Sequence, residues 1–208
     1  MKAVLVNYGH DPQDWWLKYG LEARVYDRSD DGVERIFNAE TYRTTNVGDV
    51  DFDKLSYLVE NYHTLPDVFV WGKSNLFKYV DEEYFKEKLD KGVYAPLLKQ
   101  DHKTYSDQFG VVCKYQGEMY MERADSWFFN NPQLDRREQM TWEKWCNLMQ
   151  LPQEAFIPFP PGGNFILTRE RVHRYAPEYY ARMRDMLPYA KHPAEAHACE
   201  RSYHYLWR

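Results

Sequence analysis

The sequence KAVLVN at residues 2–7 decides the fold class, together with the polar YGHD at residues 8–11 that follows it. Residues 3 to 6 are all apolar, and the two valines among them are β-branched, which is typical of a strand buried on both faces. Strands of this kind belong to parallel sheets that helices cover on both sides. We therefore predict a parallel strand whose carboxyl end opens into a polar loop.

The same pattern recurs twice further along the chain. Residues 22–26, EARVY, run into the polar DRSDDG, and residues 67–71, DVFVW, run into GKSN. Between them, residues 52–62 carry apolar side chains at helical spacing. Strand, helix and strand in this order make a right-handed crossover unit. The sequence thus predicts an α/β fold with a mixed, mostly parallel central sheet flanked by helices, and a ligand site along the carboxyl edge of that sheet.

Later segments predict further elements. The Gln-Gly pair at residues 116–117 separates two β-prone runs, residues 111–115 and 118–122, as a two-residue hairpin turn would. Thr168 and Pro177 are well placed to begin helices. We also expect a last strand at residues 164–167 and helices over residues 81–91, 142–150 and 194–207. A length of 208 residues without an internal repeat indicates a single domain over residues 1–208.

Composition and charge exclude several classes of partner. The net charge is −5 with both signs interspersed, so no basic stripe offers a footprint for nucleic acid. No apolar run has the length of a signal sequence or a membrane span, so we expect neither, and a cytoplasmic location. The cysteines show no paired short spacing, which argues against a disulfide framework and a zinc ribbon. We expect buried thiols at Cys113, Cys146 and Cys199.

The stretch PFPPGGNFILTRERV at residues 158–172 combines two rigid prolines with two glycines directly before a strand-like run. Proline fixes φ, and glycine permits positive φ and close approach of a ligand or another backbone segment. A surface turn that feeds a core strand explains the pattern as well. The stretch alone leaves both alternatives open.

The last predicted helix carries four polar residues on one face: His197, Glu200, Arg201 and His204. A solvated face with a Glu200–His204 contact is one interpretation. A second places Glu200 as a general base and Arg201 as an anion partner in a cleft. A third makes His197, Glu200 and His204 metal ligands, although the spacing of a familiar zinc helix is missing.

The sequence DVDFD at residues 49–53 contains two overlapping Asp-x-Asp triplets, which can hold a divalent cation. A metal-binding triplet should follow a buried strand, whereas these aspartates precede an amphipathic helix, where they suit an N-cap. We therefore predict that Asp51 and Asp53 hold no catalytic metal. After the strand at residues 67–71 stands Lys73, whose ammonium group could neutralise phosphate directly.

Taken together, these segments resemble nucleotide-sugar glycosyltransferases of the GT-A fold, most closely a fungal and bacterial domain family of unknown function beside the core-2 branching type. The resemblance covers most of the chain in order, but not residues 85–150. It rests on VYDRSDDG at the second strand end, NVG at 46–48, YLVENYHTLPDVFVWG at 57–72, PFPPGGNFILTRERVHRYAPEYYARM at 158–183 and ERSYHYLW at 200–207.

The resemblance implies a nucleotide donor, which we expect to be a UDP-sugar, and assigns residues to its site. Donor contacts are implied for Asn7, Tyr8, Asp27 and Asn46, and acceptor contacts for Gly162, Gly163, Asn164 and Arg169. Glu200 matches an acidic position on the last helix and is expected to act as base, with Asp125 as the next candidate. Since the family's carboxylate triplet is missing after the third strand, Lys73 and Arg201 are expected to hold the diphosphate. This favours a reaction without a metal cofactor, with Mn²⁺ or Mg²⁺ as the alternative.

The expected function is therefore transfer of a sugar from a nucleotide-sugar to a hydroxyl of a glycan or small acceptor. An inverting mechanism would use Glu200 to deprotonate that hydroxyl. A glycan-binding or scaffold module that retains the fold without turnover is the alternative, because fold does not imply activity. A metal-dependent hydrolase that uses the two histidines of the last helix is a third.

Overall fold

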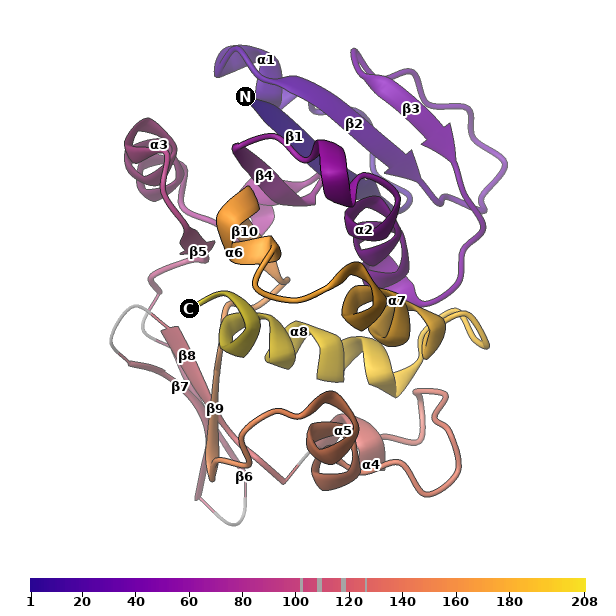
Figure 1. Ribbon diagram of the computed structural model, residues 1–208, viewed down its shortest axis with the longest axis vertical. Coiled ribbons are helices and arrows are strands. Elements are labelled where there is room, and N and C mark those ends of the chain that lie inside the picture. The colour runs from indigo at the N-terminus through magenta and orange to yellow at the C-terminus, as the bar shows by residue number, and fades with distance from the viewer. Residues whose placement is uncertain (102, 108–109, 117–118, 126) are drawn as a thin grey trace.

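The computed structural model describes residues 1–101, 103–107, 110–116, 119–125 and 127–208, and Figure 1 shows how its elements are arranged. Within these residues the larger sheet has six strands in the order β3-β2-β1-β4-β10-β5. Strands β1 to β4 pair in parallel, and β10 runs antiparallel to both β4 and β5. The predicted mixed, mostly parallel sheet is confirmed. The strand bounds are β1 (Lys2–Asn7), β2 (Glu22–Asp27), β3 (Glu40–Arg43), β4 (Val68–Lys73), β5 (Ala95–Leu97) and β10 (Asn164–Thr168).

Alternate side chains of the central strands project to opposite faces of this sheet and fill two cores. On β1, Val4 and Val6 belong to one core, while Ala3 and Leu5 belong to the other. All four are buried. The unbroken apolar run of β1 is required because neither face of the sheet meets water.

Helices cover both faces, as predicted (Figure 1). Thr168 caps α6 by accepting a hydrogen bond from the Arg171 backbone nitrogen, and Pro177 opens α7, so both predicted helix starts are confirmed. One face of the sheet packs against α2 (Asp49–Glu60), α6 (Arg169–Val172), α7 (Pro177–Asp185) and α8 (Ala194–Trp207). The other packs against α1 (Trp15–Lys18) and α3 (Glu82–Lys91). Short 3₁₀ turns are η1 (Tyr62–Thr64) and η2 (Leu76–Lys78).

A second, antiparallel sheet in the order β6-β7-β8-β9 lies beyond the first. It confirms the two predicted hairpin strands, while Gly117 of the predicted turn lies outside the described residues. Two helices lie beside this sheet, α4 (Trp127–Asn130) and α5 (Trp142–Met149), and α5 was predicted. The strands are β6 (Thr104–Asp107), β7 (Gly110–Gln116), β8 (Met119–Arg123) and β9 (Phe156–Phe159).

The corner at residues 160–163 carries the chain from β9 of one sheet to β10 of the other. Gly162 and Gly163 have φ of 89° and 58°, in the left-handed region that favours glycine. The Gly163 nitrogen closes the turn by donating to the Pro160 carbonyl at 3.0 Å. The glycines are therefore needed for the change of sheet, whatever else approaches them.

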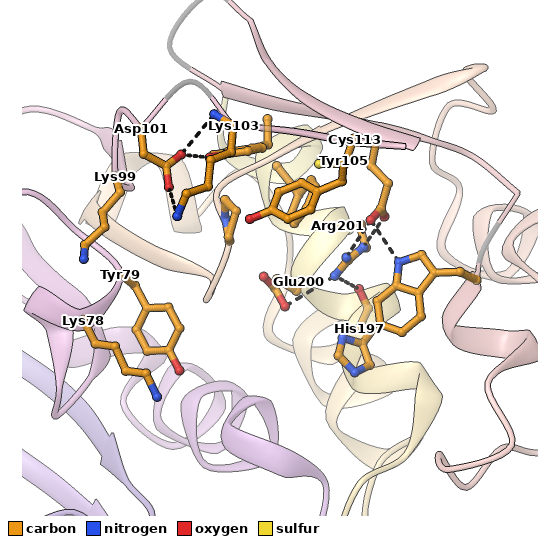
Figure 2. A pocket seen from close by; sticks show the side chains of 15 residues that line it. Lys78, Tyr79, Lys99, Asp101, Lys103, Tyr105, Cys113, His197, Glu200 and Arg201 are labelled. Atoms are coloured by element: carbon orange, nitrogen blue, oxygen red, sulfur yellow. Dashed lines mark hydrogen bonds and ion pairs between the residues drawn. The ribbon is translucent and has the colours of Figure 1, made fainter. Parts of the chain in front are cut away.

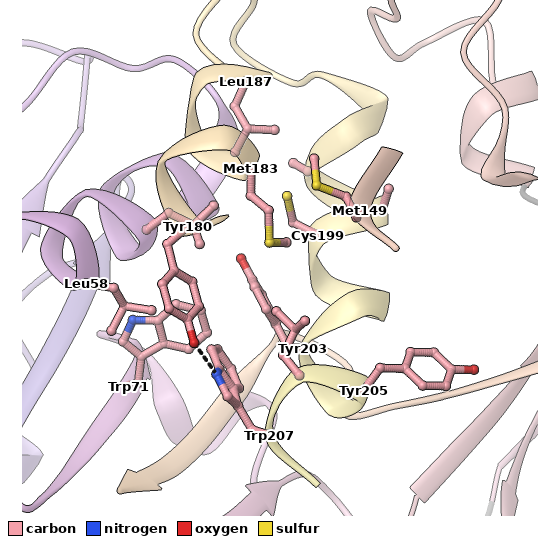
Figure 3. Close-up of a cluster of buried hydrophobic side chains, with 14 of the residues drawn as sticks. Leu58, Trp71, Met149, Tyr180, Met183, Leu187, Cys199, Tyr203, Tyr205 and Trp207 are labelled. Atoms are coloured by element: carbon pink, nitrogen blue, oxygen red, sulfur yellow. Dashed lines mark hydrogen bonds between the residues drawn. The ribbon is translucent and has the colours of Figure 1, made fainter. Parts of the chain in front are cut away.

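Helix α8 lies at the centre of the molecule, between the large sheet and α4 and α5 (Figure 1). Eleven of its fourteen residues are buried. Tyr203 and Trp207 stack on each other at 5.0 Å and meet the Trp71 ring of β4 edge-on (Figure 3). The interpretation of the polar face as solvated fails for Arg201, which is only 4% exposed, while His197, Glu200 and His204 are partly exposed.

Helix α2 begins at Asp49, three residues before the expected start at residue 52, and Asp51 and Asp53 make no capping hydrogen bond. Gly48 occupies the N-cap position, and both aspartates lie buried in the first turns of the helix. The predicted capping role is wrong because the two carboxylates turn inward to partners in the core.

Two expectations from composition can be compared with the described residues. Cys113, Cys146 and Cys199 are buried free thiols, as predicted. No helix in the described part of the chain combines the length and apolar character needed to cross a membrane.

Candidate functional site

The carboxyl ends of β1, β2 and β4 form a polar edge at the point where the connections change sides. Helix α1 follows β1 on one face, and α2 precedes β4 on the other, so β1 and β4 flank a topological switch point, where α/β sheets bind ligands. The Ser74 hydroxyl donates to Asn7 Oδ1 at 2.6 Å, and Asn7 Nδ2 donates to Asp27 Oδ1 at 3.1 Å. The structure thus brings these predicted donor-site residues together.

Burial separates these residues into two groups. Asn7 and Asp27 are 0% exposed, and Asn46 is 7% exposed, so in this structure they hold loops in place. Asn46 accepts from Arg28 Nη2 at 3.0 Å and donates to Asp30 at 2.9 Å. Tyr8, by contrast, is 41% exposed and presents its ring to solvent. Of these four predicted donor residues, Tyr8 is the one whose exposure would allow direct contact with a ligand.

Lys73, at the end of β4, connects this edge to the glycine corner. Its backbone nitrogen donates to Asn164 Oδ1 at 3.0 Å, and its ammonium lies 4.5 Å from the centre of the Tyr79 ring. Asn164 is fully buried, and its Nδ2 has no partner among the described residues. The predicted donor lysine and the predicted acceptor corner are thus neighbours.

The corner is held from both sides by charged groups. The Gly162 nitrogen donates to Glu200 Oε1 at 2.6 Å, and Lys54 Nζ donates to the Gly163 carbonyl at 2.7 Å. A Cβ on Gly162 would stand 2.7 Å from Asn164 Nδ2, whereas one on Gly163 would meet Glu200 Cγ and Lys54 Nζ at an ordinary 3.5 Å. Close approach is therefore a reason for glycine at position 162, while position 163 needs glycine for its positive φ.

Lys54 is a residue that the sequence analysis missed. It is 0% exposed and lies 4.6 Å from the centre of the Trp71 ring. Burial lowers the pKa of Lys54, and the charge of Asp51 opposes that change. Burial likewise raises the pKa of Asp51, which accepts a hydrogen bond from the Tyr203 hydroxyl at 2.7 Å. The burial of Lys54 could have been inferred from its spacing in the sequence. It lies at helical spacing from Asp51 and Leu58, on the buried side of α2.

A cavity of about 660 Å³ opens beside the corner, between the second sheet, η2 and α8 (Figure 2). Its volume lies in the range of small-molecule sites. Its lining combines aromatic rings with charged groups. The lining residues are Lys78, Tyr79, Lys99, Asp101, Lys103, Tyr105, Cys113, Tyr120, Glu122, Trp127, Phe159, Pro161, His197, Glu200 and Arg201.

Glu200 and His197 reach this cavity from α8 (Figure 2). Glu200 also lies 3.4 Å from Arg201 Nη1, so its carboxylate is oriented by the backbone and by a cation. The His197 ring lies against Trp127 and Phe128. Burial, and then the charge of Arg201, lower the pKa of His197, so the ring is neutral at neutral pH. Glu200 is the carboxylate that α8 directs into the cavity.

Arg201 differs from its prediction. Its Nε and Nη2 donate to the Glu122 carboxylate at 2.7 and 3.1 Å, and its guanidinium lies 4.2 Å from the centre of the Phe159 ring. The ion pair is 5% exposed on both sides. Arg201 lines the cavity, but its guanidinium is already paired with Glu122 of β8, which argues against its predicted role as the partner of a diphosphate.

Two further predicted residues lie away from the cavity. Arg169 stands at the end of β10, at the opposite edge of the sheet from the corner, and pairs with Asp67 at 3.1 Å. His204 is not among the residues that line the cavity. Within the described residues, no three His, Cys, Asp or Glu side chains form a group suited to a metal ion. The structure therefore does not bring together the three proposed metal ligands of α8.

The Arg201–Glu122 pair predicts a stability effect. Arg201→Met should lower the free energy of unfolding by about 3–5 kcal/mol, because the Glu122 carboxylate would stay buried without its partner. The double variant with Glu122→Leu should regain most of this loss. As a control, Lys86→Met removes the exposed pair with Asp90 and should leave stability nearly unchanged. Urea unfolding measures all three, and an unchanged Arg201→Met protein would contradict the structural role.

Asp53 predicts a pH effect. Burial raises the pKa of Asp53 to about 6, while Arg28 opposes the change, so the folded protein holds this proton more tightly than the unfolded chain. The stabilisation that comes from this bound proton is fully present below about pH 4, and it is lost as the pH rises through 6. The wild-type free energy of unfolding should therefore fall by about 2 to 3 kcal/mol relative to Asp53→Asn between pH 4 and 7. Parallel urea-unfolding profiles for the two proteins would contradict this, and Asp90→Asn serves as the exposed control.

Comparison with known proteins adds no assignment to this geometry. No family model, curated protein or solved structure matches the chain. The cavity and its neighbouring sheet edge are therefore the features that bear on function.

Proposed function

We propose that this protein is a GT-A-like glycosyltransferase that transfers a sugar from a nucleotide-sugar, with UDP as the expected nucleotide, to a hydroxyl of a glycan or small acceptor. One observation carries the proposal. Glu200 reaches an aromatic-lined cavity of about 660 Å³ that adjoins the carboxyl edge of the mostly parallel sheet. This arrangement offers a carboxylate that faces a cavity large enough for an acceptor, and a separate polar edge for a nucleotide.

The donor would lie along the carboxyl edge. Tyr8 offers an exposed ring for stacking on the base, and Lys73 offers a cation beside the corner for the diphosphate. Asn7, Asp27 and Asn46 would act as positioning residues, since they are buried and hold the loops around Tyr8. Because Arg201 is paired with Glu122, the diphosphate role falls to Lys73 in this proposal. A divalent cation stays the alternative.

The acceptor would occupy the cavity. In an inverting displacement, Glu200 takes the proton of the acceptor hydroxyl as its oxygen forms a bond to the anomeric carbon, and the bond from that carbon to the diphosphate oxygen breaks. The Gly162 nitrogen donates to Glu200 Oε1 at 2.6 Å and Arg201 Nη1 donates to Oε2 at 3.4 Å, so the proposal assigns the proton to Oε2, which is held by the longer contact. The aromatic rings of the lining suit the apolar faces of a sugar.

A glycan-binding module without turnover is the second candidate, and one contact favours it. Glu200 is held by Gly162 at 2.6 Å and approached by Arg201 at 3.4 Å, as a carboxylate that only braces the corner would be. The cavity would then bind a saccharide without a donor at the sheet edge. The two candidates differ in whether Glu200 is needed for catalysis or only for binding.

Glu200→Gln separates these candidates. A general base contributes roughly 10²- to 10⁴-fold to rate, so transfer from a UDP-sugar should fall by that order while UDP binding is unchanged. The matched control is Glu178→Gln, at an exposed position of α7, which should leave transfer unchanged. Full transfer by a folded Glu200→Gln protein would move the base to another residue.

Thermal unfolding tests the donor edge. UDP at a hundred times its dissociation constant should stabilise the fold by about 2.7 kcal/mol, which raises Tm by about 5–10 °C. GDP and CMP should have smaller effects. Tyr8→Ala should reduce the UDP-induced shift, whereas Tyr42→Ala, whose side chain is also 41% exposed in the native protein, should retain it. Equal shifts for all nucleotides, or none, would contradict a uridine site here.

A further inference from the structure

The wall of the cavity that faces α8 is rich in lysine. Lys78 and Lys99 lie across the cavity from Glu200 and Arg201, and Lys103 lies beside Asp101 on the same side (Figure 2). These lysines come from separate segments, since Lys78 ends η2 and the other two lie between β5 and β6. The fold therefore gathers positive charge at one wall of the site.

This charge is unusual for the molecule and is only partly neutralised. The chain as a whole carries a net charge of −5. Lys103 pairs with Asp101 at 3.0 Å, but Lys78 and Lys99 make no ion pair within the described residues. The positive charge also acts on nearby His10. Burial lowers the pKa of His10, and the charges of Lys78, Arg35 and Lys73 lower it further. Two ammonium groups on exposed residues, neither of them in an ion pair with the described part of the chain, thus line the cavity.

The lining of the same cavity also has an aromatic component. Tyr79, Tyr105, Trp127 and Phe159 contribute rings to its lining. Rings of this kind pack on the apolar face of a sugar, while ammonium groups attract an anion. Neither feature alone would select between a neutral saccharide and a simple anion, but together they suit a molecule that has both a sugar ring and a negative charge.

We propose that the acceptor is an acidic saccharide, whose carboxylate or sulfate meets Lys78 and Lys99 while its reacting hydroxyl faces Glu200. This inference rests on the proposed function for the role of the bound sugar as acceptor. The cavity volume of about 660 Å³ accommodates a disaccharide. The charge would set the orientation, because it anchors the end of the saccharide that lies away from Glu200.

The donor diphosphate is the competing anion, and position argues against it for Lys99. Lys73 lies at the end of β4 beside the corner, whereas Lys99 follows β5, which is separated from β4 by β10. Strands β4 and β5 end at the same edge of the sheet, because both run antiparallel to β10, but β10 separates them by two strand spacings, which is about 10 Å, so Lys99 lies further along that edge than Lys73. A variant at Lys99 should discriminate between the two anions.

Calorimetry with a matched set of three ligands tests the inference. The probes are a neutral disaccharide that ends in glucose, the same disaccharide sulfated at C6 of that glucose, and the corresponding disaccharide that ends in glucuronic acid. At least one acidic probe should bind about ten-fold more tightly than the neutral one, and this preference should shrink at high salt. Equal binding of acidic and neutral probes, or no binding of any, would overturn the inference.

Charge-removing variants complete the test. Lys78→Gln and Lys99→Gln should each weaken the acidic probe several-fold and leave the neutral one unchanged, and Lys144→Gln, at an exposed position outside the cavity lining, should change neither. Loss of UDP affinity in Lys99→Gln to the same extent would overturn the inference, since the lysine would then serve the donor. A UDP-sugar transfer assay with the neutral disaccharide is the separate readout for the proposed function: transfer without acidic preference retains the function and overturns the inference, whereas acidic preference without any transfer overturns the function and leaves an acidic-saccharide binding site.

Discussion

The burial of a charged helix between two sheets is the constraint on which the rest of the structure depends. Arg201 of α8 is 4% exposed, and such a charge is tolerated in a protein interior only when a partner of opposite sign is held in good geometry. Glu122 of β8 supplies that partner through two hydrogen bonds. Because the pair joins α8 to the second sheet while Trp207 and Tyr203 join it to the first, it fixes the space between the sheets, and that space is the cavity.

The glycine corner couples this cavity to the polar edge of the large sheet. Gly162 donates to Glu200, and the Gly163 carbonyl accepts from Lys54, so one short turn touches both α8 and α2. Lys54 also interacts electrostatically with Asp51, which accepts a hydrogen bond from the Tyr203 hydroxyl. The position of the Glu200 carboxylate therefore depends on a buried network that spans two helices, and a change in any member would be felt at the cavity wall.

The sequence predicted the elements whose cause is local. The apolar run of β1, the Thr168 cap and the bounds of α8 follow from neighbouring residues alone. Strand β9 was missed because Pro158 weakens a strand pattern, and only its edge position beside β8 makes the proline acceptable. Arg169 was placed with the corner because it follows closely in sequence. A five-residue strand spans about 16 Å, however, and carries it to the other edge of the sheet.

The site residues likewise divide into those whose position follows from local sequence and those whose surroundings depend on distant parts of the chain. Asn7 and Asp27 were correctly expected at one edge, since parallel strands end together, but the hydrogen bond from Ser74 to Asn7 comes from a residue far along the chain. Buried residues at such an edge cannot contact a ligand directly, but they fix the loops around it. Under the proposed function, selectivity at the edge belongs to exposed groups such as Tyr8, and selectivity in the cavity to the charged wall opposite α8. Substitutions at those two surfaces are accordingly the ones that the proposal expects to change substrate preference without unfolding the protein.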